Sequence, residues 1–121
     1  MEIMRAAEGD TVERSAAAIF EGGAVWVRGL TGDGGNNVVN VLMVQFAAGA
    51  RTVMHRHSGD QVLYVVAGIG KVGDREGEHV ISAGDSVVIS ANTDHWHGAH
   101  DTGSPMSHIS VIAAGDETTI S

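Results

Sequence analysis

Short apolar runs separated by glycine and polar residues dominate this chain. Within a run, apolar side chains recur at every second position, and each run is bounded by residues that favour turns. Runs of this kind predict β-strands, with alternate side chains on opposite faces. The runs cover residues 24–30, 38–47, 51–57, 61–67, 86–90 and 106–113. This pattern predicts about eight to ten short strands and an all-β sandwich or barrel.

Three segments depart from the strand pattern. Residues 16–20 could form one helical turn capped by Ser15, although Gly22 and Gly23 stop it at once. Residues 31–37 are predicted to form a turn-rich loop. Residues 115–121 form a polar tail that we expect to fray.

The composition sets the class of protein. With 121 residues, the chain is predicted to be a single domain, 1–121, with its core at about 24–113 between an N-terminal segment and a short C-terminal tail. A net charge of −8 argues against binding to nucleic acid or to an anionic membrane, because both need clustered positive charge. The chain has no cysteine, so a metal would be held by nitrogen and oxygen atoms.

The apolar runs also bear on location and assembly. The N-terminal residues lack the basic start and apolar run of a signal peptide, and the run at 62–69 is too short to cross a bilayer. We therefore expect a cytoplasmic protein. The run at 38–47 is apolar on both faces, which predicts that one face packs on the core and the other on a second subunit.

The candidate chemistry begins with His55 and His57. These residues are two apart, so on a strand both imidazoles project to the same side and can chelate one ion. Residues 58–60 favour a tight turn, after which Gln61 can direct its side-chain oxygen at the same point. One hairpin would then supply three ligands.

A second histidine cluster lies at 94–100 and can supply a fourth ligand. His97 has the same strand parity as His95 and should face the same cavity. His100 is offset in parity, which favours a loop or rim position. Trp96 falls on the opposite face, where packing is the better interpretation than substrate stacking. His79 stands apart and is interpreted as an exposed structural histidine.

These residues resemble the two cupin motifs. The first is Gly49, five residues, His55-Arg56-His57, three residues, Gln61, six residues and Gly68; the second runs from Gly84-Asp85 to His95. Gln61 replaces the usual acidic residue of the first motif. In the second motif Ser90 and Asn92 replace the usual proline and glycine, so its turn could be shaped differently. The glutamine variant resembles a narrower group of small cupins associated with carboxymuconolactone decarboxylase, some of which are manganese-dependent hydroxynitrile lyases.

The resemblance implies a fold, a metal site and an assembly. The fold would be all-β, a double-stranded β-helix or jelly-roll barrel, and cupins of this size form homo-oligomers, dimers or tetramers. The metal ligands would be His55, His57, Gln61 and His95, with His97 and His108 beside open positions as catalytic residues. Met106, His108 and Ser110 should share the cavity face. Three imidazoles and an amide suit divalent Mn, Fe, Ni or Zn, with Mn favoured by the resemblance.

The favoured function is Lewis-acid lyase chemistry on a small hydroxy compound. Without a ligand carboxylate the metal keeps its full charge, which favours polarisation over oxygen chemistry. His97 would act as general base, and Val53, Leu63 and Met43 would face the substrate. Three alternatives stay open: an iron-dependent dioxygenase for a diketone or phenol, a cupin acting on sugars, and a non-catalytic module that binds a metal or small ligand.

Overall fold

A computed structural model describes residues 1–31 and 38–121 and contains twelve strands there. The predicted loop at 31–37 therefore lies, apart from Thr31, outside the described residues. The strands are β1 (Thr11–Glu13), β2 (Phe20–Glu21), β3 (Val25–Gly29), β4 (Val39–Phe46), β5 (Arg51–Thr52), β6 (His55–His57), β7 (Gln61–Asp74), β8 (Glu78–Ser82), β9 (Ser86–Ile89), β10 (His95–Ala99), β11 (Met106–Ala113) and β12 (Thr118–Ile120).

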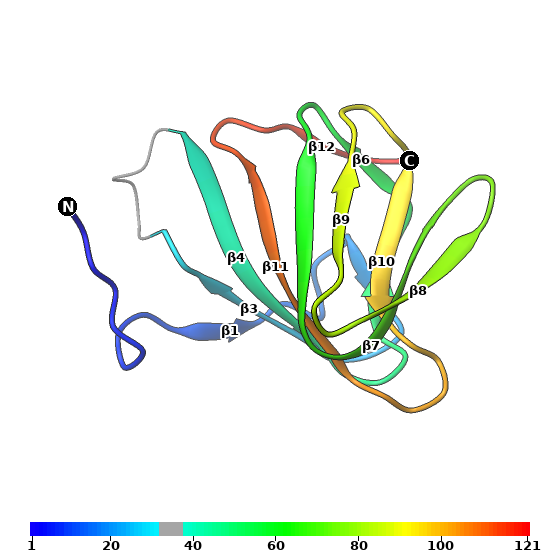
Figure 1. The fold of residues 1–121 in the computed structure, drawn as a ribbon, viewed down its shortest axis with the longest axis horizontal. Helices are drawn as coiled ribbons and strands as arrows, with labels where there is room; N and C mark the ends of the chain where they lie inside the picture. The colour runs from blue at the N-terminus through cyan, green and yellow to red at the C-terminus, as the bar shows by residue number, and fades with distance from the viewer. Residues whose placement is uncertain (32–37) are drawn as a thin grey trace.

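All strand pairs are antiparallel, and the strands curl into a half-open barrel (Figure 1). What we call the β4 sheet contains β1, β3, β4, β11, β9 and the first half of β7. The β10 sheet contains β10, β5, β2, β6, β12, β8 and the second half of β7. Strand β7 therefore belongs to both sheets, and its bend connects the β4 sheet to the β10 sheet.

The bend in β7 occurs at Gly68. This residue has a φ of +80°, a left-handed conformation that side chains with a Cβ disfavour. A Cβ at this position would also collide with the carbonyl oxygen of Pro105. Glycine is thus needed where the strand leaves the β4 sheet and enters the β10 sheet.

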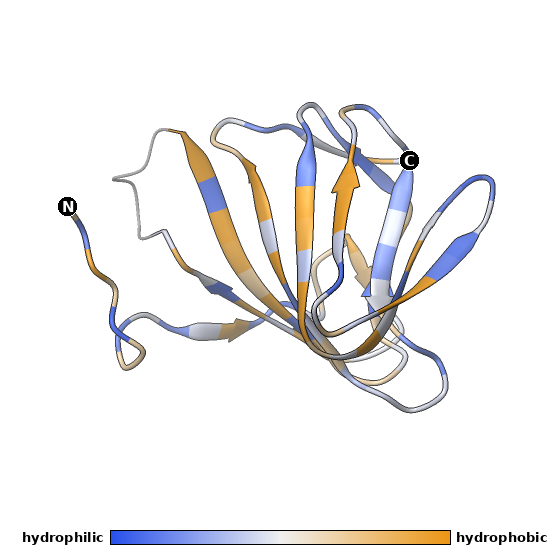
Figure 2. Ribbon diagram, in the orientation of Figure 1, coloured by the Kyte–Doolittle hydropathy of each residue, from blue (hydrophilic) through white to orange (hydrophobic). Residues whose placement is uncertain are grey.

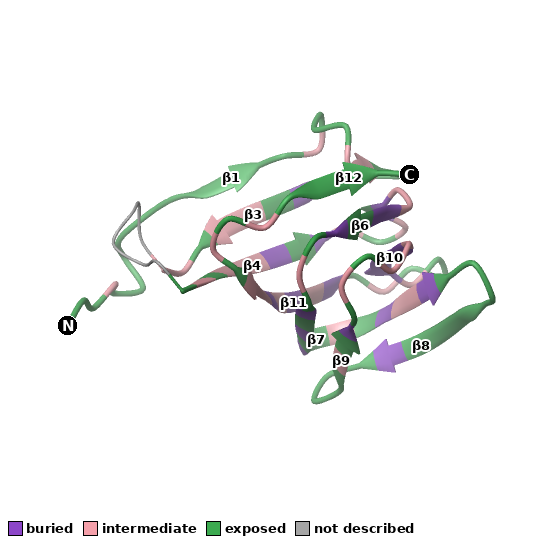
Figure 3. Cartoon of the chain, turned by 90° about the horizontal axis from the view of Figure 1, so that it is seen from above, coloured by how far each residue is buried: buried purple, intermediate pink, exposed green. Residues whose placement is uncertain are grey.

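The core lies between the two sheets, and Figure 3 shows buried segments on β4, β7, β10 and β11. The end of β4, the first half of β7 and most of β11 alternate between buried and more exposed residues, as the sequence pattern predicts. The core cluster consists of Val25, Val44, Phe46, Ala50, Val65, Ile81, Ala99 and Met106. Leu63 is fully buried, in agreement with its predicted inward position.

The prediction that Met43 faces inward is wrong. The inward positions of β4 are those of Val44 and Phe46, so Met43 lies on the outer face, opposite Ile109 and Arg28 in the neighbouring strands. Because both faces of β4 are apolar, the alternation alone could not tell the inner face from the outer one.

Figure 2 shows hydrophobic segments along the neighbouring strands β4, β11, β7 and β9. The residues that point away from the core form the outer face of the β4 sheet. Val88, Val62, Val111 and Val41 form one row across β9, β7, β11 and β4. In the next row Tyr64 lies opposite Ile109, and Tyr64 and Val88 are exposed. This face is where a second subunit would pack, and the homo-oligomer stays a prediction.

Two local predictions at the chain ends are wrong. Residues 16–19 form turns, not a helical turn, and β2 begins at Phe20. The Ser15 hydroxyl accepts a hydrogen bond from the distant Val25 N–H at 2.9 Å. The C-terminal tail does not fray, because β12 pairs with β6 and Ser121 N–H donates to the Met54 carbonyl at 3.0 Å. No helix among the described residues is long and apolar enough to span a bilayer.

Candidate metal centre

Neighbouring strands bring the histidines of the two motifs together. His55 on β6 lies directly opposite His95 on β10, and their ring centroids are 4.3 Å apart. His57 follows on the same face of β6, with its ring 5.0 Å from that of His55 and 5.5 Å from that of His95. His97 extends the cluster along β10, 5.7 Å from His95. All four side chains are buried.

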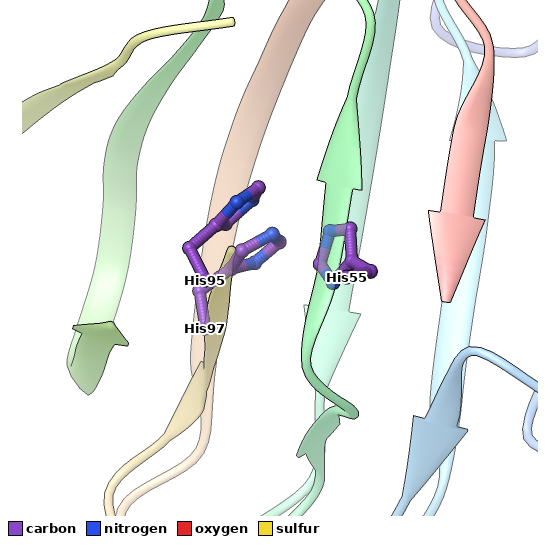
Figure 4. Close-up of side chains that lie close together, drawn as sticks. All are labelled: His55, His95 and His97. Carbon is purple, nitrogen blue, oxygen red and sulfur yellow. The ribbon is translucent and has the colours of Figure 1, made fainter. Parts of the chain in front are cut away.

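Three of these histidines bring their ring nitrogens close together. One ring nitrogen each from His55, His95 and His97 lies within 4.8 Å of the others. Figure 4 shows His95 and His97 projecting from the same side of β10 beside His55. Of the residues predicted to bind metal, this group contains His55 and His95, and it adds His97, predicted to be catalytic.

Hydrogen bonds at Nδ1 fix the tautomers of the three predicted histidine ligands. The Nδ1 atoms of His55 and His95 lie 2.8 Å from the backbone carbonyl oxygens of Val53 and Thr93. His57 Nδ1 lies 2.8 Å from Asp116 Oδ2. Carbonyl and carboxylate oxygens only accept hydrogen bonds, so each Nδ1 carries the hydrogen and each Nε2 presents its lone pair.

Gln61 completes the predicted set from the opposite sheet. Its amide nitrogen donates to the Ser110 hydroxyl at 2.8 Å, which leaves Oε1 turned to the histidines, 3.2 Å from His95 Nε2. Gln61 and Ser110 are both buried, at 4% exposure each. The amide oxygen is therefore held at the same point as the Nε2 lone pairs.

His97 and His108 form a pair that joins the two sheets. His108 Nε2 lies 2.9 Å from His97 Nδ1. His108 projects inward from β11 with Met106 and Ser110, and all three are buried, as predicted. The backbone N–H of His97 donates to the Thr52 hydroxyl at 3.1 Å. The ring of Phe46 packs against both imidazoles.

Burial keeps four histidines of the site, His55, His95, His97 and His108, in the neutral form. Loss of hydration lowers the pKa of His55 to about 4, although its bond to the Val53 carbonyl acts in the opposite direction. Burial also lowers the pKa of His108 to about 4 and that of His95 below its usual value. The pKa of His97 is lowered well below its usual value, first by burial and then by His108. These four imidazoles are therefore uncharged at neutral pH, with a hydrogen on only one ring nitrogen.

These residues fit a divalent metal ion. Within the described part of the chain, the buried Nε2 atoms of His57 and His97 have no hydrogen-bond partner. A buried polar atom without a partner is costly unless something binds it. Neutral imidazole nitrogens and an amide oxygen are suitable donors for Mn, Fe, Ni or Zn.

The turn before His95 adapts to the residues that depart from the cupin pattern. Asn92 has a φ of 61°, the left-handed conformation that glycine favours and asparagine tolerates. Its N–H donates to the His57 carbonyl at 2.8 Å, which ties this turn to β6. Asn92 therefore takes over the conformational role of glycine at this position.

The remaining histidines and Trp96 lie outside the cluster. His79 is exposed, and His100 follows β10 in a loop with its Nδ1 2.6 Å from the Thr102 hydroxyl. Trp96 is buried on the opposite face of β10, where the Arg51 guanidinium lies 4.4 Å from the ring centroid. These positions agree with the interpretations drawn from strand parity.

The sequence interpretation missed the residues that support the cluster. Asp116 lies in the segment predicted to fray, while Thr52 and Ser110 look like ordinary strand residues. Only the contacts of these side chains reveal their part in the site. The one signal in the sequence was that Ser110 shares its strand parity with His108, which predicts that its side chain points inward.

The family model for the cupin domain matches residues 42–112. The chain belongs to the cupin family. This membership and the observed strands confirm the predicted jelly-roll barrel.

Among solved structures, a cupin-like protein from Thermotoga maritima is 32% identical, with a TM-score of 0.75 over 95% of this chain and 85% of that one. A polyketide cyclase from Streptomyces resistomycificus superposes with a TM-score of 0.82 over 99% of this chain and 84% of that one. At 12% identity, the second likeness concerns the fold alone.

An (R)-mandelonitrile lyase from Granulicella tundricola is 44% identical over 70 residues, which are 56% of this chain and 52% of that protein. The cupin chain thus spans about half the length of the curated relative it matches. The match is consistent with the resemblance to cupin hydroxynitrile lyases.

Proposed function

We propose that this cupin is a metal-dependent lyase that cleaves a small hydroxynitrile to a carbonyl compound and hydrogen cyanide. His55, His57, Gln61 and His95 would hold the metal, with Mn favoured over Fe, Ni and Zn. The similarity to an (R)-mandelonitrile lyase supports the reaction class. The observation that carries the proposal is the difference between the Nδ1 partners of these histidines and the Nδ1 partner of His97.

The Nδ1 partners separate the histidines into two roles. Those of His55 and His95 are carbonyl oxygens that only accept a hydrogen bond. The nearest partner of His57 is the Asp116 carboxylate at 2.8 Å, with the Thr118 hydroxyl 3.0 Å away, so each of these imidazoles is held with a free lone pair at Nε2. The partner of His97 is another imidazole, His108, which can either donate or accept. A histidine with such a partner can gain and lose a proton, so we assign His97 to proton transfer.

The reaction uses His97 as base and then as acid. The bound metal would supply Lewis acidity that lowers the pKa of the substrate hydroxyl. When His97 donates from Nδ1 to His108 Nε2, its Nε2 lone pair is free to take the hydroxyl proton. The C–O bond then becomes a carbonyl as the bond to the nitrile carbon breaks and its electron pair leaves with cyanide. His97 returns the proton to cyanide, which balances the reaction.

The surroundings of His97 keep it neutral and oriented before this proton transfer. The ring is buried beside Phe46, and the low pKa that burial imposes on His97 leaves the imidazole unprotonated at neutral pH. His108 is fully buried behind it and fixes the orientation of the ring. General acid–base catalysis by a positioned histidine contributes about 10²–10⁴-fold in rate.

Metal reloading and one variant test the proposal. Metal-free protein is reloaded separately with Mn, Fe, Ni and Zn, and benzaldehyde release from mandelonitrile is followed. We expect stoichiometric metal and turnover, and a loss of about 10²-fold or more in kcat for His97→Asn with its metal retained. His79→Asn, an exposed histidine, is the control and should keep full activity.

Three results would contradict parts of this assignment. Metal-loaded protein that cleaves no hydroxynitrile would refute the lyase function. Turnover that requires both iron and oxygen would show that the site catalyses an oxidation and not a lyase reaction. Loss of metal from His97→Asn would make His97 a ligand, as its distance from His55 and His95 allows.

A further inference from the structure

The C-terminal segment 116–120 closes over the strand that carries the first histidine pair. Strand β12 pairs with β6 so that Thr118 lies opposite His57 and Ile120 opposite His55. Ser58 strengthens this pairing, because its hydroxyl accepts from the Glu117 N–H and its own N–H donates to the Glu117 carbonyl, both at 2.9 Å. The segment is therefore part of the wall of the site.

Asp116 lies at the start of this segment and faces His57. Its side chain is 2% exposed and that of His57 is 8% exposed, with Oδ2 2.8 Å from His57 Nδ1. The other oxygen, Oδ1, accepts from the Gly59 N–H at 3.0 Å and the Ser58 hydroxyl at 3.3 Å. Burial acts to raise the pKa of Asp116, but these hydrogen bonds and His57 hold it below its usual value. Asp116 is thus an ionised carboxylate.

We infer that Asp116 is a positioning residue of the metal centre, supplying through His57 the negative charge that Gln61 does not provide. This inference rests on the metal-dependent function proposed above. A ligand set of three imidazoles and one amide carries no charge, so a divalent cation at this buried point needs an anion nearby. Among the oxygen atoms that hold Nδ1 in His55, His57 and His95, only the one from Asp116 belongs to a charged group.

The carboxylate acts on the ligand in two ways. It forces the hydrogen of His57 onto Nδ1, so Nε2, which is buried and unpartnered within the described chain, presents its lone pair. It also makes that nitrogen more basic than a backbone carbonyl partner would. On this inference, the carboxylate that Gln61 does not provide comes from Asp116, which contacts the ligand His57 and not the metal.

The test compares two variants that remove the same charge. Asp116→Asn removes the carboxylate that contacts His57, and Glu117→Gln removes the exposed carboxylate next to it. The affinity for Mn²⁺ is measured by competition with a chelator, starting from metal-free protein. We expect Asp116→Asn to lose about 10–100-fold in affinity, Glu117→Gln to stay at the wild-type value, and Asp116→Glu to retain more affinity than Asp116→Asn.

Two further measurements separate positioning from a structural role. Urea unfolding of each metal-free variant reports whether the C-terminal segment stays in place, and Ser58→Ala loosens that segment without removing the carboxylate. The visible spectrum of the Co²⁺-loaded protein should change in Asp116→Asn and stay unchanged in Ser58→Ala, because only the former changes the charge of the group that is hydrogen-bonded to a ligand.

The outcomes distinguish this inference from the function on which it rests. Equal Mn²⁺ affinity in wild type and Asp116→Asn would overturn the role of Asp116 and leave the lyase proposal standing. Equal losses of affinity in Asp116→Asn and Ser58→Ala would reduce Asp116 to a structural contact. Failure of the wild-type protein to bind Mn²⁺ or Co²⁺ would overturn the metal centre itself.

Discussion

Acid should destabilise the metal-free protein through its buried histidines, and His108 provides the sharpest test. Its side chain is fully buried, and burial lowers its pKa from 6.5 to about 4. Between these pH values the unfolded chain binds a proton that the folded chain does not. The free energy of unfolding must therefore fall as the pH falls from 6.5 towards 4.

The size of the effect follows from the pKa of His108. One pH unit within this window changes the free energy of unfolding by up to about 1.4 kcal/mol per histidine. Integration for His108 gives a loss of about 2 kcal/mol between pH 7 and pH 5. His55, with its pKa also near 4, adds a loss of the same sign, so the whole protein should show a steeper dependence than His108 alone explains.

Urea unfolding of the metal-free protein at several pH values between 4.5 and 7.5 measures this dependence. The His108→Leu variant removes the titrating group, so its free energy of unfolding should change by about 2 kcal/mol less than that of wild type between pH 7 and pH 5. His79→Leu is the matched control, because its imidazole is exposed in the folded chain. Equal pH dependence in His108→Leu and wild type would refute the reasoning, whatever their absolute stabilities.

Three further predictions concern the fold and the assembly. Asn92→Gly should leave the urea midpoint almost unchanged, whereas Asn92→Val should lower the stability by about 1–2 kcal/mol, because a β-branched residue resists the left-handed conformation; equal midpoints would contradict this. Gly68→Ala should lower the melting temperature through a clash with the Pro105 carbonyl and a strain of about 1–3 kcal/mol, and an unchanged value would count against the bend. Tyr64→Lys should reduce the mass of the predicted homo-oligomer in sedimentation with an unchanged circular dichroism spectrum, and an unchanged mass would remove this face from the interface.

Much of the local structure could be predicted because strand alternation is a local property. The apolar runs correspond to β3, β4, β9 and β11, and the two-residue spacing places His55 and His57 on one buried face. The same parity correctly places His97 inward and Trp96 on the opposite face. Parity could not decide which face of β4 is inward, because both faces are apolar, and so the position of Met43 was predicted wrongly.

Residue spacing along the chain specifies which side chains share a strand face, which residues can bind a metal and which family the motifs resemble. What lies across from each face depends on the folded barrel, because strand pairing joins residues far apart in the chain. That pairing sets His95 opposite His55, directs Gln61 through Ser110, and joins His97 to His108 between the two sheets. It also brings Asp116 to His57. A polar tail shows no periodicity, so its place beside the site depends on contacts formed when the barrel closes.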